Sequence, residues 1–259
     1  MSLPVFGFVS VHDVALPDGT AREADWLSGV AASGRPVAHL WRGTAGFVVP
    51  RSYERLPHWS QACVHGAATG WPVQVRSSGG GLVPQGPGVW NLSLAWPAPG
   101  AAPTGTDGIY RALTAELGAA FARLEIVAEA QAVEGSFCDG RFNLAVGGRK
   151  CVGTAQAWRR IGGHAVVLAH AVIVVDADPV VLTEAANRFE AAAGGARRYR
   201  ADALTSLAGA WCVAHHQAHP PDDFDQRVLT RVAERFARLV APRVYAETST
   251  TKENHDGAA

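Results

Sequence analysis

Two stretches of the chain carry apolar residues at the spacing of an amphipathic helix. The first stretch has apolar residues at Ile109, Leu113, Leu117, Phe121 and Leu124. The second follows Asp222 and has them at Phe224, Val228, Val232, Phe236 and Leu239. These intervals of three and four place each set on one face of a helix, and Asp107 and Asp222 lie near the expected starts. We expect two helices whose apolar faces pack against a core.

Elsewhere the hydrophobic period is two, as in a strand. In "WNLSLAW" (90–96) large apolar residues alternate with Asn91, Ser93 and Ala95, which predicts a half-buried strand. The β-branched run "HAVVLAHAVIVVD" (164–176) is long enough for a central strand. The elements do not alternate regularly as βαβ units, and no G-x-G-x-x-G follows a strand. The pattern therefore predicts an α+β fold, a mixed β-sheet flanked by helices, rather than a dinucleotide-binding domain.

Segments rich in glycine and proline, at 79–88 and 97–108, interrupt this pattern and predict loops. No internal repeat is visible. We expect residues 1–245 to form a single domain and the polar residues 246–259 to form a C-terminal tail.

Composition excludes several partners. Apolar residues make up 48% of the chain and charged residues 18%, and 23 basic residues balance 23 acidic ones. A chain without net charge lacks the excess of positive charge that binds nucleic acid, so we expect no nucleic-acid partner. No basic leader and no apolar run of about 18 residues is present, so we expect no membrane partner and a cytoplasmic protein. The four cysteines lack C-x-x-C spacing and are expected to be reduced thiols.

The pair Gly147–Gly148, between "RFNLAV" and "RKCVGTAQAW", predicts a two-residue hairpin turn, because a type I′ turn needs positive φ at both central positions. In such a hairpin (141–157), the numbers of two residues that face each other across the strands sum to 295. Leu144 is then opposite Cys151, and Ala145 is opposite Lys150. The same register places Phe142 opposite Gly153, Asn143 opposite Val152 and Cys138 opposite Ala157.

Alternation sorts the hairpin into two faces. One face is apolar and is assigned to the core; it carries Phe142, Leu144, Val146, Cys151, Gly153 and Ala155. The other carries Arg141, Asn143, Lys150, Thr154 and Gln156, with Ala145 and Val152. This polar face is either solvated or faces a ligand. Cys151 is expected to be a small buried hydrophobe.

Cys138 is a different kind of cysteine. A straight ladder would keep it roughly 20 Å from Lys150. The two can meet only if "GSFCDG" (135–140) is a loop that folds back over the polar face. A thiol beside a cationic amine would then be suited to nucleophilic attack.

Several motifs occur in the order seen in one enzyme family. They are "RSSGGGLV" (76–83), "GVWNLSL" (88–94), "GRK" (148–150), "GTAQ" (153–156) and "VLAHAVIVVD" (167–176). Together they resemble the lipoate–protein ligase and octanoyltransferase family over roughly residues 20–210. Within it, "GSFCDGRFNL" (135–144) resembles the segment that carries the nucleophile of the cysteine-dependent octanoyl amidotransferases.

The resemblance implies the catalytic-domain fold of biotin and lipoate transferases, which is related to the class II aminoacyl-tRNA synthetase core. It implies catalytic roles for Cys138 and Lys150, with Lys150 contacting the acyl carbonyl. Substrate-binding residues implied by the matched motifs are Arg76, Ser78, Gly79, Gly80, Gly81, Asn91, Asn143, Gly153, Thr154, Ala155, Gln156 and His170. By themselves, the three glycines could instead form a tight turn, and Arg76 could be a solvated strand end. An apolar tunnel for the acyl chain is expected, lined in part by Val75, Leu82, Val83 or Leu92.

The implied activity is transfer of an octanoyl or lipoyl group, through a Cys138 thioester, to a lysine of a lipoyl domain. The expected donor is an acyl carrier protein or an octanoylated lipoyl-type domain, and no metal or cofactor is required. Pro84–Gln85 replaces the His-Asp usual in ligases, Phe142–Asn143 replaces Asn-Asp, and Ala171 replaces a glycine. These differences disfavour the alternative, an ATP- and Mg²⁺-dependent ligase acting through lipoyl-AMP. A non-catalytic homologue that binds a lipoyl domain or acyl group is a further alternative.

One further cluster, "CVAHHQAH" (212–219), has the spacing of a metal site. No carboxylate accompanies it, and Pro220–Pro221 ends the segment. A partly exposed helix end is the preferred interpretation.

Overall fold

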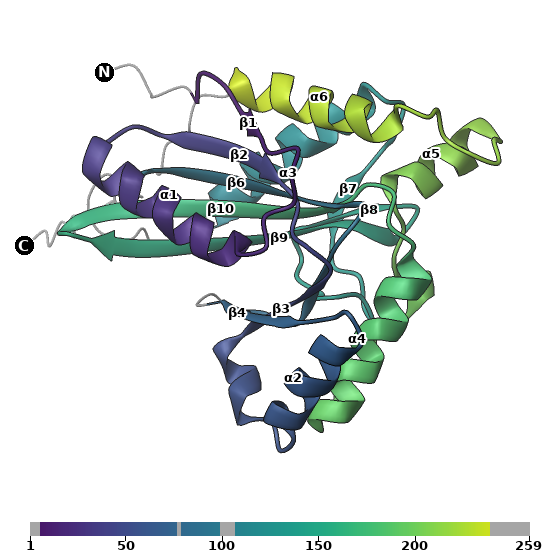
Figure 1. Cartoon of the computed structure of the whole chain (residues 1–259). Helices are drawn as coiled ribbons and strands as arrows, with labels where there is room; N and C mark the ends of the chain where they lie inside the picture. The colour runs from purple at the N-terminus through teal and green to yellow at the C-terminus, as the bar shows by residue number, and fades with distance from the viewer. Residues whose placement is uncertain (1–5, 77–78, 99–106, 239–259) are drawn as a thin grey trace, which may run out of the picture.

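The structure is a computed structural model that describes residues 6–76, 79–98 and 107–238; Ser78, Leu239 and the expected tail at 246–259 lie outside these ranges. The described chain forms a seven-stranded sheet and a three-stranded sheet, which lie one above the other (Figure 1). This arrangement confirms the expected α+β class.

Every strand pair in the large sheet is antiparallel except β1 with β2. In spatial order the strands are β1 (Ser10–Val11), β2 (Val37–Trp41), β6 (Val89–Pro97), β10 (His164–Val174), β9 (Arg149–Ile161), β8 (Asn143–Val146) and β7 (Glu129–Gln131). The β-branched run is therefore a central strand, as expected, since β10 lies between β6 and β9.

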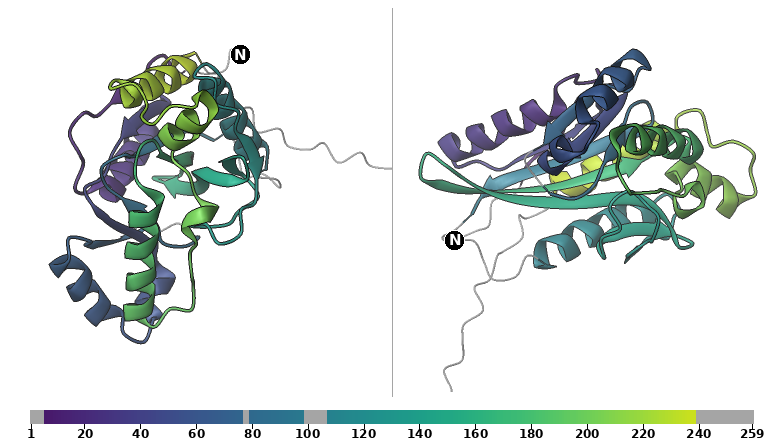
Figure 2. Two further views of the ribbon diagram at one scale, coloured as in Figure 1. Left: turned by 90° about the vertical axis from the view of Figure 1, so that its right-hand side faces the viewer. Right: turned by 90° about the horizontal axis from the view of Figure 1, so that it is seen from below.

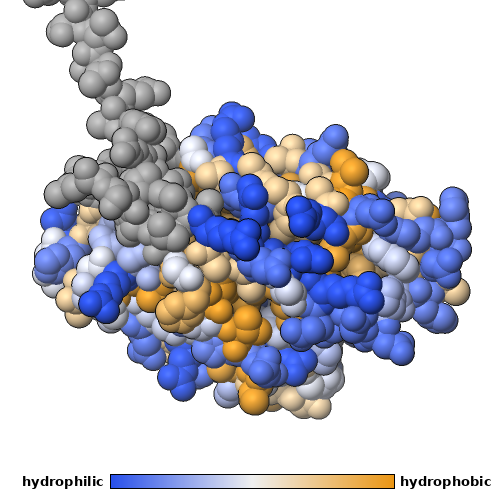
Figure 3. Space-filling model, turned by 90° about the horizontal axis from the view of Figure 1, so that it is seen from above, coloured by the Kyte–Doolittle hydropathy of each residue, from blue (hydrophilic) through white to orange (hydrophobic). Residues whose placement is uncertain are grey.

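Helices cover one face of the large sheet and bury most of its apolar side chains. They are α3 (Asp107–Ala122), α5 (Leu207–His215) and α6 (Phe224–Ala237). Both expected helices are confirmed, because their apolar residues within the described ranges are buried in this core, Leu124 only in part. The outer surface on this side mixes hydrophilic residues with apolar patches (Figure 3).

The opposite face of the large sheet packs against α1 (Gly19–Ser33) and the three-stranded sheet (Figure 2). The small sheet has the order β4 (Val73–Arg76), β3 (Gly46–Pro50) and β5 (Val83–Gln85). Beyond it lie α2 (Trp59–Ala68), α4 (Pro179–Ala193) and two short 3-10 helices, η1 (Arg51–Arg55) and η2 (Ala201–Ala203). Hydrophobic residues of both sheets and of α4 form a second core.

Helix α4 has recognisable start and stop signals. The Asp178 carboxylate accepts a hydrogen bond from the Val180 backbone N–H at 2.8 Å, and Pro179 occupies the first turn. The helix ends at Gly194, whose φ of 77° is left-handed. Between these caps, Leu182, Ala186 and Phe189 pack α4 into the second core.

The alternation in β6 is correct, but the strand is not half-buried. Leu92 and Leu94 face the helices, whereas Asn91 and Ser93 face the small-sheet side, and all four are buried. Both faces of β6 are buried because the small sheet and α1 cover the face that would be exposed to solvent in a two-layer protein. Buried polar side chains on that face require partners within the protein.

The hairpin turn is confirmed at Gly147–Gly148, with φ values of 55° and 75°. Ala145 pairs with Lys150 as expected, but the register then shifts, and Leu144 pairs with Val152. Cys151 is thus the extra residue of a β-bulge. The expected pairings of Leu144 with Cys151 and of Asn143 with Val152 are wrong.

The bulge changes the face sorting beyond it. After one extra residue, Gly153 and Ala155 point to the same side as Lys150, so their assignment to the core face is wrong. Thr154 points the other way and donates a hydrogen bond to the Phe142 carbonyl at 2.8 Å.

Two further residues depart from the ladder. Phe142 precedes β8 instead of pairing with Gly153, and its ring stacks on Tyr110 of α3 at 5.0 Å. Cys138 lies in a loop instead of pairing with Ala157.

Cys151 is fully buried, with its sulfur 3.5 Å from the Leu144 carbonyl oxygen. We therefore expect Cys151→Ser to lower the free energy of unfolding by about 1–3 kcal/mol, because a hydroxyl replaces a thiol in an apolar site. Urea denaturation measures this change. Cys63→Ser on the partly exposed face of α2 is the control, and an equal loss in both variants would contradict the role of Cys151 in the core.

Candidate functional site

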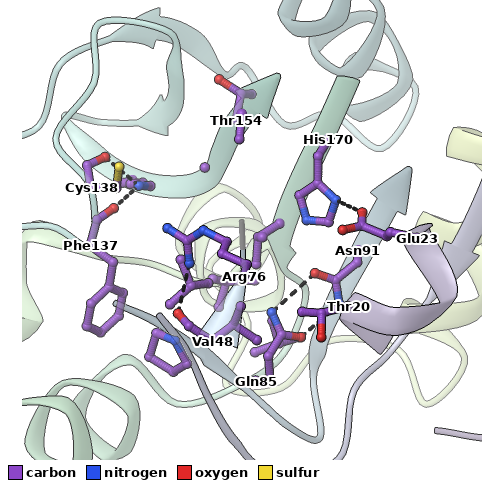
Figure 4. Close-up of a pocket in the computed structure, with 18 of the residues that line it drawn as sticks. Thr20, Glu23, Val48, Arg76, Gln85, Asn91, Phe137, Cys138, Thr154 and His170 are labelled. Atoms are coloured by element: carbon purple, nitrogen blue, oxygen red, sulfur yellow. Dashed lines mark hydrogen bonds and ion pairs between the residues drawn. The ribbon is translucent and has the colours of Figure 1, made fainter. Parts of the chain in front are cut away.

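A single cavity between the two sheets gathers most of the residues singled out from the sequence (Figure 4). Its volume is about 1040 Å³, a figure that includes the open mouth. The motif-matched residues that line it are Arg76, Gly79, Asn91, Cys138, Lys150, Gly153, Thr154, Ala155, Gln156 and His170.

The walls of the cavity are mainly apolar. They include Val48, Val83, Val89, Phe137, Leu168, Val172, Val174, Leu182 and Leu204. Of the residues expected to line an acyl tunnel, Val83 does so. Leu92 faces the helices on the other side of the sheet, while Leu82 and Val75 pack in the second core. An apolar chain would be sheltered from water between these walls.

Lys150 comes from β9, immediately before the bulge, and only 5% of its surface is exposed. Its ammonium donates hydrogen bonds to the backbone carbonyls of Phe137 and, at 3.0 Å, Cys138. A Cβ on Gly153 would come within 3.1 Å of Nζ, so the absence of a side chain there gives the lysine room.

The chain contains 21 arginines but only two lysines, Lys150 and Lys252. Arginine stays protonated in proteins, whereas a buried lysine can lose its proton. Burial lowers the pKa of Lys150 to about 8, although the nearby charges of Cys138 and Asp139 oppose the change. The site therefore holds a cation that can exchange a proton near neutral pH.

The Cys138 loop folds back over β9, as a meeting with Lys150 requires. Besides Lys150, the Asn143 side-chain amide donates to the Cys138 carbonyl, at 2.8 Å. The residue itself has a left-handed φ of 57°, which is uncommon outside glycine. Two side chains thus hold the backbone of Cys138 in a conformation that it would not favour alone.

The sulfur of Cys138 lies beside the glycine segment. A Cβ on Gly80, whose φ is 105°, would come 3.1 Å from Cys138 Sγ and 3.0 Å from Arg76 Nη2. Only glycine leaves space for the thiol and the guanidinium to approach the backbone here.

Arg76, at the end of β4, binds the chain itself. It donates to the carbonyls of Gly79 and Gly81 at 3.0 and 2.7 Å, and to that of Val48 at 2.9 Å. Burial lowers the pKa of Arg76, and the charges of Cys138, Tyr53 and Glu23 oppose this. Arg76 is therefore a clamp on the glycine segment, not a solvated strand end.

A second polar group lies across the cavity from the Cys138 loop in the view of Figure 4. His170 Nδ1 and Glu23 Oε1 are 2.6 Å apart, and the Ser93 hydroxyl donates to Glu23 at 2.7 Å. Burial alone would raise the pKa of Glu23, but the charge and hydrogen bond of His170, with the Ser93 hydrogen bond, hold it below its usual value. The carboxylate is thus kept ionised and paired.

The buried amides of Gln85 and Asn91 face each other and exchange two hydrogen bonds, of 2.8 and 3.2 Å. Gln85 is one of the positions at which the chain departs from the ligase pattern. The pair is neutral and self-satisfied, so this wall offers no carboxylate.

Several residues in the cavity were not identified from the sequence. Glu23 and Thr20 belong to α1, which the sequence analysis did not single out, and Trp41 ends β2. Nothing distinguishes Glu23 in sequence from a solvated helical carboxylate. Only the packing of α1 over β6 and β10 brings it to His170.

The interpretation of residues 212–219 as a partly exposed helix end agrees with the contacts of His215, the last residue of α5. Its ring stacks on Trp211, and its Nε2 lies 2.7 Å from Glu125. Among the described residues no three His, Cys, Asp or Glu side chains are grouped to hold a metal ion. None of the helices within residues 6–76, 79–98 and 107–238 has the length and apolarity needed to cross a membrane.

The comparisons with known proteins define the class. Residues 29–232 match the family model of the lipoyl protein ligase A/B catalytic domain, and the chain belongs to this family. An uncharacterized protein of Cupriavidus necator is 41% identical over 226 residues, which cover 83% of this chain and 88% of the relative.

An octanoyl-[GcvH]:protein N-octanoyltransferase of Kyrpidia tusciae is 38% identical over 191 residues, 69% of this chain. The match spans 63% of that enzyme's length, less than two thirds. Among solved structures, protein Ta0514 of T. acidophilum with bound lipoic acid superimposes with a TM-score of 0.59 at 14% identity, covering 91% of this chain and 85% of that chain. This likeness confirms the expected fold of the lipoate ligases.

Because the chain has two lysines, lysine-selective isotope labelling will give two side-chain signals in an NMR titration. We expect one of them to titrate near pH 8, below the usual value of about 10.4, since burial disfavours the charged form. The Lys150→Met variant should lack that signal. Titration of both signals near pH 10.4 would contradict the proton-exchanging character of Lys150.

We expect iodoacetamide to alkylate Cys138 before the other three cysteines. Cys138 lines the open cavity, whereas burial raises the pKa of Cys63 and raises that of Cys151 to about 12, which disfavours the reactive thiolate of both. Peptide mass spectrometry over a time course at pH 7.5 measures the four rates. Earlier modification of Cys63 or Cys212 would contradict this assignment.

Proposed function

We propose that this protein is an acyltransferase of lipoate metabolism, which moves an octanoyl (or lipoyl) group through a thioester on Cys138 to a lysine of a lipoyl-type domain. One observation carries the proposal: in the wall of a mainly apolar cavity, Cys138 Sγ and Arg76 adjoin Gly80, and the Lys150 ammonium donates a hydrogen bond to the Cys138 carbonyl. The name of the Kyrpidia tusciae relative supports this substrate class.

In the first step the Cys138 thiolate attacks the carbonyl carbon of the acyl donor. The donor is an octanoylated lipoyl-type domain, with an amide, or an acyl carrier protein, with a thioester. The carbon–nitrogen or carbon–sulfur bond breaks as the new thioester forms, and the departing amine or thiolate takes a proton. Lys150 supplies that proton, because its ammonium lies at the Cys138 backbone and its pKa is near neutral.

In the second step the neutral amine of the acceptor lysine attacks the thioester. The carbon–sulfur bond breaks, and the Cys138 thiolate leaves. The attacking nitrogen must lose a proton, and the neutral Lys150 amine formed in the first step accepts it. Lys150 thus returns to its starting state, and the two half-reactions balance without a metal or a further cofactor.

The surrounding residues bind and orient the acyl group. The valines and leucines of the cavity hold the chain, and Gly153 and Ala155 keep the β9 wall open. The glycine segment Gly79–Gly81 brings backbone close to the carbonyl that reacts, where N–H groups stabilise developing negative charge. Arg76 holds this segment through its carbonyls, and Asn143 holds the Cys138 loop.

The alternative activity, that of an ATP-dependent lipoate–protein ligase, fits the side chains of the cavity less well. Among described residues lining the cavity, Glu23 is the carboxylate, and it is paired with His170. Gln85, whose amide is paired with that of Asn91, belongs to the Pro84–Gln85 pair that replaces the His-Asp of ligases. No carboxylate of this wall is left to hold Mg²⁺, which prefers oxygen ligands of this kind.

The decisive experiment is acylation of the intact protein, followed by mass spectrometry. With an octanoylated lipoyl-type domain as donor, we expect the wild type and the Cys63→Ser control to gain one octanoyl group as a hydroxylamine-sensitive thioester. Cys138→Ser should gain none and should lose transfer to an acceptor domain by at least about a thousandfold, because the nucleophile is removed.

The other outcomes identify the alternatives. Normal transfer by Cys138→Ser in the presence of ATP and free octanoate would establish the ligase instead. Binding of the acylated domain without any transfer by the wild type would establish a non-catalytic homologue.

A further inference from the structure

A buried carboxylate lies behind the glycine segment, outside the walls of the cavity. Glu190, on α4, is 1% exposed, and its Oε1 accepts hydrogen bonds from the hydroxyls of Tyr53 at 2.5 Å and Tyr199 at 2.9 Å. Removing a carboxylate from water is costly, and a buried charge is not in itself a gain in stability. The arrangement therefore raises the question of what the two phenols position.

Tyr53 connects this carboxylate to the site. Its hydroxyl has one proton, which it donates to Glu190, and it accepts a hydrogen bond from the Leu82 backbone N–H at 3.3 Å. Glu190 thus orients the phenol so that a lone pair faces Leu82. Because Leu82 directly follows Gly81 and is fully buried, this bond anchors the end of the glycine segment.

Tyr199 connects the same carboxylate to the other side of the site. Its ring packs against that of Phe137 at 4.8 Å between centroids, and Phe137 precedes Cys138. Its backbone N–H and carbonyl are both held by the Asn187 side chain of α4, at 2.9 and 2.8 Å. Helix α4 is therefore connected to both segments that border the Cys138 sulfur, through Tyr53 on one side and Tyr199 on the other.

We propose that Glu190 is a positioning residue for acylation of Cys138, acting through Tyr53 on the segment Gly79–Leu82. This inference rests on the acyl transfer proposed above. Gly80 adjoins both Cys138 Sγ and Arg76 Nη2, so a shift of the segment changes the approach of the carbonyl to the thiol. A misplacement of about 1 Å at a reacting centre can lower a rate on the order of a hundredfold.

The two phenols offer a matched pair of variants. Tyr53→Phe and Tyr199→Phe each remove one hydroxyl from the same carboxylate oxygen, but only Tyr53 is bonded to Leu82. We expect Tyr53→Phe to lower the rate constant of Cys138 acylation at saturating donor at least about tenfold. The donor concentration that gives half of the maximal rate should stay unchanged. Tyr199→Phe should lower this rate constant less than about threefold, although its melting temperature should change about as much as that of Tyr53→Phe. Equal acylation rates in the two variants would overturn the proposal.

Glu190 itself is tested by a second pair. Glu190→Gln retains an oxygen acceptor for Tyr53 and should keep acylation within about threefold of the wild type. Glu190→Leu has no acceptor and should match Tyr53→Phe. Equal acylation by the Gln and Leu variants would show that the oxygen does not act through the phenol. Arg197, which approaches both Gly81 and the Tyr199 hydroxyl, is measured separately as Arg197→Met and is expected to resemble Tyr199→Phe.

A measurement without substrate keeps this inference distinct from the proposed function. Hydrogen exchange of the peptide containing Leu82 should be faster in Tyr53→Phe than in Tyr199→Phe or the wild type, because the Leu82 N–H loses its acceptor. Unchanged exchange in Tyr53→Phe would overturn the link to the glycine segment. If wild-type Cys138 takes no acyl group, the proposed function fails, whereas the exchange result still reports on the link.

Discussion

The site depends on one buried cation that is hydrogen-bonded to the chain's own backbone. The Lys150 ammonium donates to the carbonyls of Phe137 and Cys138, and this contact joins the Cys138 loop to the central sheet. An ammonium without such partners could not remain charged in an apolar cavity. The same two carbonyls that stabilise the charge therefore also hold the Cys138 loop over β9.

This constraint explains the local irregularities of the chain. The bulge at Cys151 allows Lys150, Gly153 and Ala155 to face the cavity while Cys151 and Val152 remain in the core. Cys138 adopts a left-handed backbone because Lys150 and Asn143 both bind its carbonyl. Strained backbone at a site persists when its surroundings determine it from several directions, as they do here.

The charges around the cavity are arranged in two separate groups. Arg76 binds three carbonyls and Lys150 two, so neither cation is directed at a carboxylate. Glu23 is paired with His170 and Ser93 on the opposite wall, and Glu190 lies behind the glycine segment with two tyrosines. Glu23 and Glu190 are thus both satisfied by partners other than Arg76 and Lys150.

Much of the architecture could be predicted from the sequence, because it depends on local periodicity and turn chemistry. The stripes that start at Ile109 and Phe224 determined two helices, the run at 164–174 determined the central strand, and Gly147–Gly148 determined the hairpin turn. The ordered motifs identified the family and ten of the residues that line the cavity. Only the tertiary structure decided the bulge at Cys151, the pairing of Glu23 with His170 and the connection of Glu190 to Leu82 through Tyr53. These features join residues that lie far apart in the chain or insert a single residue into a ladder, and hydrophobic periodicity along the sequence contains no information on either.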